Sequence, residues 1–187
     1  MDSPSLLKGM TSQTIMYSGP GDAGIADGTN NHLGNASKAY LVDFLEYCQQ
    51  ENLDHVVFVN FPRYFQHEDK SDLLGRVADI QQIVEEYGFD FVDLQKEKTL
   101  IGLDVQTDFY NSHHLNVYGQ EKLTNYLGDL IVNKYQLFPR EQSAVNKAYW
   151  EASAQASEQY FAYGREEISA GNLVYLSNDA DIPSLNN

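Results

Sequence analysis

The chain has 187 residues, of which 42% are hydrophobic and 12% aromatic, so it is long and apolar enough to fold around a core rather than remain disordered. Acidic residues outnumber basic residues by 27 to 12, and the formal charge of −15 would repel nucleic acids and anionic lipid surfaces. No apolar run reaches the roughly 20 residues of a membrane span. The single cysteine, Cys48, is expected to be a buried core residue. The sequence indicates no particular compartment or oligomeric state.

Composition and local patterns divide the chain into four segments. We expect an irregular, glycine-rich N-terminal segment, an α/β domain, a C-terminal helix and a flexible tail, at residues 1–36, 37–138, 139–170 and 171–187. A short strand is expected at 13–17. Within the α/β domain, an amphipathic helix at 37–51 precedes an apolar strand at 55–60.

A second helix and strand follow the first pair with short connections. The helix is predicted from Ser71 to Gly88, where glycine suits a left-handed C-terminal cap, and the strand at 89–94 follows directly. Both strands are continuous apolar runs, which is typical of strands buried on both faces of a parallel sheet. The alternation therefore predicts a βαβ unit and an α/β layered domain.

The next part of the chain combines a polar loop with two helices. The loop spans 108–116, and Asn116 is expected to be the N-cap of the helix that follows it. Pro139 separates this helix from a long final one. An apolar stripe along the final helix comprises Val145, Tyr149, Ala152, Ala156 and Tyr160.

The polar loop contains the block Asn111-Ser-His-His114-Leu-Asn116-Val-Tyr-Gly119. This block resembles the one that closes SGNH/GDSL hydrolase domains, in which Asp-x-x-His is often followed by Leu-Asn and by a glycine five residues after the histidine. The sequence around it is similar to the branch found among bacterial cell-surface polysaccharide genes. The similarity runs from about Tyr40 to Arg140, roughly half of the chain.

The resemblance implies a fold and an activity. The fold would be a three-layer, flavodoxin-like parallel sheet of the SGNH type, incomplete at its N-terminal end and extended by a C-terminal helix. The activity would be hydrolysis or transfer of an O-acyl ester on a cell-surface carbohydrate, with an acylated carbohydrate or small ester as the partner. No cofactor or metal is implied.

The resemblance also assigns roles to five residues. His114 would be the general base that takes a proton from a serine hydroxyl. Asn111 occupies the position of the family's carboxylate, and it can orient an imidazole through its side-chain oxygen without supplying charge. Asp108 is the nearby carboxylate that could replace it. Asn116 and His113 are expected beside the substrate.

The serine nucleophile of the family has no good match in this chain. In the family it belongs to a Gly-Asp-Ser-like block after the first strand, but here Gly21-Asp22-Ala23 places alanine at the serine position. Ser18 is an alternative in the same loop, and Gly28-Thr29-Asn30 imitates the oxyanion-hole block. We therefore expect that the nucleophile strand lies upstream of Met1 in a longer parent protein and that the isolated chain is inactive.

Three other interpretations remain open on the sequence alone. The adjacent histidines could be loop residues without a chemical role. Alternatively, His113, His114, Asp104 and Asp108 could ligate a metal ion. Finally, Asn111 and the missing serine would also suit a non-catalytic module, derived from an SGNH domain, that binds a glycan or a protein.

Overall fold

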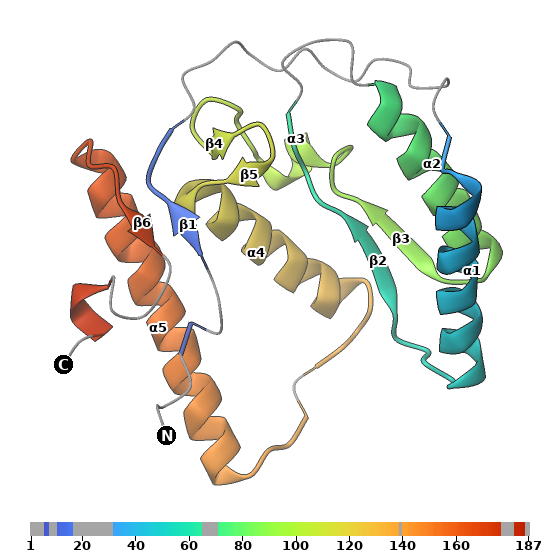
Figure 1. Cartoon of the computed structure of the whole chain (residues 1–187). Helices are drawn as coiled ribbons and strands as arrows, with labels where there is room; N and C mark the ends of the chain where they lie inside the picture. Colours follow the sequence, from blue (N-terminus) through green and yellow to red (C-terminus); the bar gives the residue numbers. More distant parts are fainter. Residues whose placement is uncertain are drawn as a thin grey trace. The chain divides into compact units, whose positions relative to one another are not determined.

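The computed structural model describes residues 6–7, 11–16, 32–64, 71–138, 140–176 and 182–185. The chain is a mixed α/β protein, as predicted, and within these residues the strands pair two by two (Figure 1). It divides into two compact units. Unit 1 combines Met1–Gly19 with Ile101–Asn187, and unit 2 is Pro20–Leu100.

Unit 2 contains the predicted βαβ arrangement. The elements of unit 2 are α1 (Asn35–Gln50), β2 (Val57–Asn60), α2 (Ser71–Glu86) and β3 (Asp90–Asp93). Strands β2 and β3 are parallel and pair along their full lengths, with α2 as the connection between them. The parallel βαβ unit expected from the alternation of apolar runs is therefore confirmed.

The core of unit 2 is built from both helices and β3. The buried hydrophobic residues of unit 2 are Leu45, Cys48, Tyr64, Val84, Val92 and Leu94. Edge-to-face ring contacts join Phe44 to Phe58 and Phe58 to Phe89, each with centroids 6.1 Å apart. Gly88 has φ +81°, the left-handed conformation that glycine adopts without a steric penalty. The expected burial of the cysteine and the glycine cap of α2 are both confirmed.

Unit 1 joins the beginning of the chain to its end. Its elements are β1 (Ser12–Gln13), β4 (Phe109–Asn111), β5 (His114–Leu115), α4 (Val117–Asn133), α5 (Ala144–Ser169), β6 (Tyr175–Leu176) and a 3₁₀ turn, η2 (Pro183–Leu185). The short helix α3 (Lys98–Ile101) spans the boundary between the units. Strand β1 pairs antiparallel with β6, and β4 pairs antiparallel with β5. Figure 1 shows β1 running between β6 and β5.

The core of unit 1 lies between α4, α5 and the C-terminal segment. It contains Leu7, Val117, Ala156, Tyr160, Phe161, Ile168, Leu176 and Ile182. Helices α4 and α5 approach closely where Val117 meets Gly164, since a Cβ on that glycine would lie 2.6 Å from a Val117 methyl group. Small residues at such positions allow two helices to pack with little separation.

The described residues of the expected flexible tail, 171–176 and 182–185, include residues that belong to the fold. Leu176 and Ile182 are completely buried, and Tyr175–Leu176 pairs with β1. The stripe on α5 is buried only in part. Ala156 and Tyr160 belong to the core, whereas Val145 is 79% exposed, because the first turns of α5 precede the segment that packs on α4.

The residues expected to form one α/β domain, 37–138, contribute to both units. Their parallel strands lie in unit 2, whereas the histidine block lies in unit 1 and forms the antiparallel pair of β4 with β5. None of the helices in the described part of the chain combines the length and the apolar character that crossing a bilayer requires.

Candidate functional site

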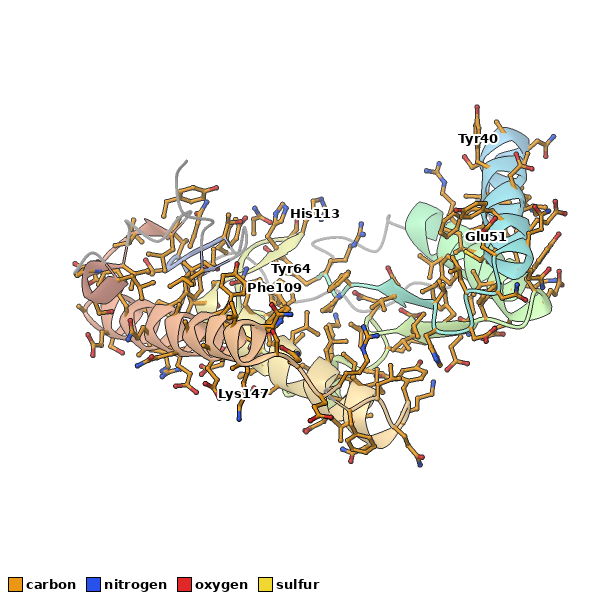
Figure 2. All side chains as sticks on the ribbon, turned by 90° about the horizontal axis from the view of Figure 1, so that it is seen from below. Tyr40, Glu51, Tyr64, Phe109, His113 and Lys147 are labelled. Atoms are coloured by element: carbon orange, nitrogen blue, oxygen red, sulfur yellow. The ribbon has the colours of Figure 1, made fainter. Side chains whose placement is uncertain are left out.

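The histidine block forms a tight hairpin between β4 and β5. Asn111 ends β4, and its side-chain oxygen Oδ1 accepts hydrogen bonds from the backbone N–H groups of His113 at 2.9 Å and His114 at 3.0 Å. Asparagine commonly stabilises turns in this way, by accepting from the backbone a few residues ahead. The turn places both histidine rings at the surface of unit 1. Figure 2 shows His113 at the outer edge, with Phe109 closer to the helices.

The same oxygen also contacts the imidazole of His114. Nδ1 of the ring lies 2.9 Å from Oδ1 of Asn111. Because two backbone N–H groups donate to this atom, it is the amide oxygen rather than the amide nitrogen, and it can only accept. The ring nitrogen must therefore donate, so the hydrogen bond selects the Nδ1–H tautomer of the neutral imidazole. The lone pair of that tautomer is on Nε2, the nitrogen that acts as the base in serine triads.

The ring of Tyr110 packs on one face of the His114 imidazole. The two rings are stacked with centroids 5.4 Å apart and planes inclined by 6°, which is an offset parallel arrangement. The ring of His113 also lies near that of His114, with centroids 6.5 Å apart and planes inclined by 69°. Burial, and secondarily the charge of Tyr175, raises the pKa of the Tyr110 hydroxyl. Tyr110 therefore remains a neutral phenol at physiological pH.

Asp108 does not take the orienting role that the sequence allowed. Its carboxylate is 1% exposed, and Oδ2 accepts from the backbone N–H of Asp104 at 2.7 Å and from Nζ of Lys122 at 2.6 Å. Oδ1 accepts from the hydroxyl of Thr107 at 3.1 Å. These contacts attach the loop before β4 to helix α4. Of the two candidates for orienting the imidazole, the structure brings Asn111 to His114.

Asn116 is an internal residue of this region. Its side chain is completely buried, and Oδ1 accepts from the N–H of Gly119 at 3.2 Å, which confirms the predicted N-cap of α4. The two amide hydrogens on Nδ2 are donated to the carbonyl groups of Ile15 at 3.1 Å and Thr107 at 2.7 Å. The polar atoms of the Asn116 side chain are thus all used inside the protein, and its expected contact with substrate stays a prediction. His113 remains exposed.

A serine of β1 that contacts the block is also internal. Ser12 is 2% exposed, and its hydroxyl donates to the carbonyl oxygen of Leu115 at 3.4 Å. This contact joins β1 to β5. The segments that the sequence suggested for the nucleophile and the oxyanion hole, Ser18, Gly21-Asp22-Ala23 and Gly28-Thr29-Asn30, lie outside the described residues.

The four residues considered as metal ligands do not converge. In the described ranges, no three or more histidine, cysteine or acidic side chains gather where they could hold a metal ion. Oδ1 of Asp104 accepts a hydrogen bond from the backbone N–H of Gln106 at 2.7 Å, and Asp108 forms an ion pair with Lys122. Competition from an ammonium group at 2.6 Å makes Asp108 a poor ligand.

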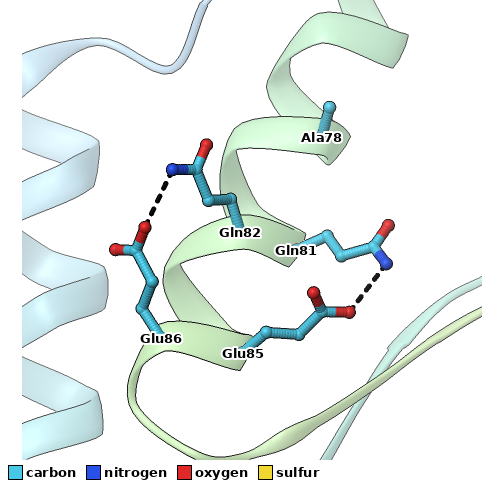
Figure 3. Close-up of a pocket in the computed structure, with 5 residues that line it drawn as sticks. All are labelled: Ala78, Gln81, Gln82, Glu85 and Glu86. Atoms are coloured by element: carbon cyan, nitrogen blue, oxygen red, sulfur yellow. Dashed lines mark hydrogen bonds between the residues drawn. The ribbon is translucent and has the colours of Figure 1, made fainter.

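Two shallow hollows each lie on a single helix, and neither is lined by residues of the histidine block. One is on α2, where Gln81 and Gln82 donate to Glu85 and Glu86 at 2.8 Å (Figure 3). The other follows the last turns of α5. In the first hollow, the polar groups satisfy one another one turn apart, as exposed helix pairs commonly do. Neither hollow competes with the hairpin as a candidate site.

Sequence reasoning missed two residues of the site. Tyr110 lies directly before the orienting asparagine, and alternation of side chains along β4 places it opposite the buried Phe109. That alternation was present in the sequence but spans only three residues. Lys122, which pairs with Asp108, could not be recognised from its position in the sequence. The contact depends on how the loop before β4 folds back on α4.

Comparison with known proteins found no match among protein-family models, curated proteins or solved structures. The resemblance to the SGNH/GDSL family accordingly depends on the histidine block and the sequence around it.

Proposed function

We propose that unit 1 carries the general base of an SGNH/GDSL-type active site, which hydrolyses or transfers an O-acyl group on a carbohydrate. The hydrogen bond between Nδ1 of His114 and Oδ1 of Asn111 is the observation that carries the proposal. It gives the imidazole the tautomer that a general base needs, at an exposed position on a hairpin whose turn is fixed by the same oxygen.

In the proposed reaction, Nε2 of His114 accepts the proton of a serine hydroxyl as that oxygen attacks the acyl carbonyl. The imidazolium then returns the proton to the departing sugar hydroxyl, and a water or a second hydroxyl removes the acyl group in the same way. Asn111 keeps the ring in place throughout. It adds no negative charge to stabilise the imidazolium, and loss of that charge in triad enzymes costs up to about 10⁴-fold in rate.

The proposal extends to the fold of the family and to the origin of the nucleophile. The parallel pair β2 and β3 would belong to a three-layer, flavodoxin-like sheet of the SGNH type. The serine would come from a part of the protein outside the described residues. No cofactor or metal takes part in the proposed chemistry.

A second candidate function is favoured by one specific observation. The residue that holds His114 is a neutral amide, whereas the family has a carboxylate at this position. A hairpin with exposed rings and a fixed turn would equally serve a non-catalytic module that binds a glycan or a protein partner. The two functions differ in whether the imidazole ever exchanges a proton with a substrate.

Ester turnover distinguishes these functions. We would measure release of p-nitrophenol from p-nitrophenyl acetate by this chain, and by the chain extended at both ends to the limits of its reading frame. We expect negligible serine-dependent turnover in the first preparation and turnover that depends on His114 in the second. A His114→Ala variant as active as the original in both preparations, or inactivity of both, would refute the catalytic proposal and favour the binding module.

A further inference from the structure

The strands around His114 present an outer face that differs sharply from their inner face. Side chains alternate along a strand, so neighbours point to opposite sides. The inward residues Phe109, Leu176 and Ser12 are at most 2% exposed. Their strand neighbours Tyr110, Tyr175 and Gln13 therefore point outward, and Tyr175 is 58% exposed. We call Tyr110, Tyr175 and Gln13 the outer face.

Contacts between the strands bring the outer face next to His114. Gln13 is opposite Tyr175 in the pairing of β1 with β6. Strand β1 is joined to β5 by the hydrogen bond from Ser12 to Leu115, the residue after His114. Figure 1 shows the resulting sequence of neighbours, from β6 through β1 to β5 and β4. Tyr110, at the β4 end, is stacked on His114 itself.

The two tyrosines are also close to each other. Burial raises the pKa of the Tyr110 hydroxyl and the charge of Tyr175 adds to the rise, in agreement with the placement of both side chains on the outer face by strand alternation and by the pairing of β1 with β6. Two phenol rings, an amide from Gln13 and the exposed His114 ring thus share one surface. Its polar atoms are hydroxyl, amide and imidazole groups.

This combination of groups suits a sugar ring. The faces of aromatic rings attract polarised C–H groups, while phenol hydroxyls and amides exchange hydrogen bonds with sugar hydroxyls. Tyrosine contributes this contact area with only two side-chain torsions to immobilise, so binding loses little conformational entropy. The net charge of −15 disfavours acidic sugars. A long acyl chain would need an enclosed apolar groove, and the outer face is open.

We propose that Tyr110 and Tyr175 form a platform that binds one neutral sugar ring beside His114. The inference rests on the proposed function, because the sugar would carry the ester that His114 acts on. It adds the binding residues and the charge class of the sugar, neither of which follows from the histidine block. Gln13 would donate or accept hydrogen bonds at the rim of the platform.

Titration with neutral oligosaccharides tests the platform without any catalytic readout. Cellotetraose, maltotetraose and chitotetraose would be added separately, while NMR follows the aromatic signals of the tyrosines and of His114. We expect at least one sugar to shift the signals of Tyr110 and Tyr175. Tyr175→Ala should weaken that binding by about three- to tenfold, the usual contribution of one aromatic contact.

Matched variants make the outcome specific. Tyr175→Phe keeps the ring and should retain most of the affinity. Tyr40→Ala removes a tyrosine that is 77% exposed on α1 of unit 2 and should leave the affinity unchanged. The platform is refuted if none of the sugars shifts these signals, or if Tyr175→Ala and Tyr40→Ala bind a sugar equally well.

The test also separates this inference from the proposed function. His114→Ala should keep the sugar affinity within about threefold, because the ring of Tyr175 supplies the larger exposed contact. Binding that persists in His114→Ala, together with inactivity towards esters in every preparation, would support the platform and refute the catalytic proposal. Ester turnover without sugar binding would refute the platform alone.

Discussion

Gly119, in the first turn of α4, packs directly against the backbone of Asp108. A methyl group in place of its hydrogen would overlap the Asp108 carbonyl oxygen and would lie 2.8 Å from the side chain of Leu115. The same carbonyl oxygen accepts the backbone N–H of Asn116 at 2.9 Å, so it cannot move aside without loss of that hydrogen bond. The close approach explains why the histidine block needs glycine at this position.

Replacement of this glycine should destabilise unit 1. We expect Gly119→Ala to lower the free energy of unfolding by about 3 kcal/mol, the upper part of the range for an overpacked site whose neighbour is backbone. Gly128→Ala on the same helix is the control, because nothing lies within 4 Å of the added methyl group. That variant should gain roughly 0.5–1 kcal/mol from helix propensity. Urea denaturation measures both, and equal effects of the two variants would contradict the packing argument.

The buried carboxylate of Asp108 should depend on its lysine. Lys122→Met removes a partner at 2.6 Å from a carboxylate that is 1% exposed. Asp108 keeps its hydrogen bonds from Asp104 and Thr107, so we expect a loss of about 2 kcal/mol, below the range for a fully orphaned buried charge.

The control for this substitution is Lys147→Met, which breaks the exposed pair of Lys147 with Glu151 at 3.8 Å. Such surface pairs contribute less than about 0.5 kcal/mol. Thermal unfolding of both variants gives the comparison. A loss for Lys122→Met as small as that for Lys147→Met would show that the Asp108 pair adds nothing to stability.

Removal of the orienting amide should change the protonated nitrogen of the imidazole. In the original protein, long-range ¹H–¹⁵N spectra at neutral pH should report the Nδ1–H tautomer of His114, because Nδ1 donates to Asn111 at 2.9 Å. In Asn111→Ala that hydrogen bond is lost, and the spectra should change to a mixture of tautomers. His55 in unit 2 is the internal reference and should not change. An Nε2–H tautomer of His114 in the original protein would contradict the proposed base.

Unit 2 should lose stability in acid through one carboxylate. Hydrogen bonds from His32, then from the backbone of Leu33, with a further contribution from Lys38, lower the pKa of Asp79 from 3.8 to about 2. A carboxylate whose pKa is lower in the folded state stabilises the fold above its unfolded pKa, and this stabilisation is lost as the pH falls from 3.8 towards 2.

The comparison variant is Asp79→Asn, which cannot titrate at this position. The difference in melting temperature between the original protein and the variant should be largest near neutral pH and should shrink below pH 3.8. NMR titration of the Asp79 carboxyl carbon gives the pKa itself. A melting difference that does not change with pH across this range would contradict the assignment.

Local patterns in the sequence were sufficient for part of the fold. The apolar runs that became β2 and β3 and the helix between them were predicted because each signal lies within a few consecutive residues. The caps at Gly88 and Asn116 were predicted for the same reason, since a cap depends on backbone conformation and on partners three residues away. Within the candidate site, the contact of Asn111 with His114 was one of two alternatives, because the family resemblance implied Asn111 and Asp108 was the nearby carboxylate that could replace it.

Contacts between distant segments could not be predicted in this way. Strands β1 and β6 have two residues each, which is too short for a period to be recognised. Their pairing, and the position of Tyr175 near Tyr110, follow from the packing of both chain ends on α4 and α5. The enclosure of the Asn116 side chain could not be predicted, because sequence patterns do not show which polar side chains are enclosed by remote segments.

The pairing of β1 with β6 has a consequence for the order in which a ribosome-bound chain acquires structure. Thr14, next to β1, exchanges hydrogen bonds with Val174, 160 positions later, so β1 lacks its paired strand β6 until residues 175–176 have been synthesised. Unit 2 is one continuous stretch, Pro20–Leu100, and can close as soon as it leaves the exit tunnel. The histidine hairpin therefore acquires its complete surroundings only at the last stage of translation.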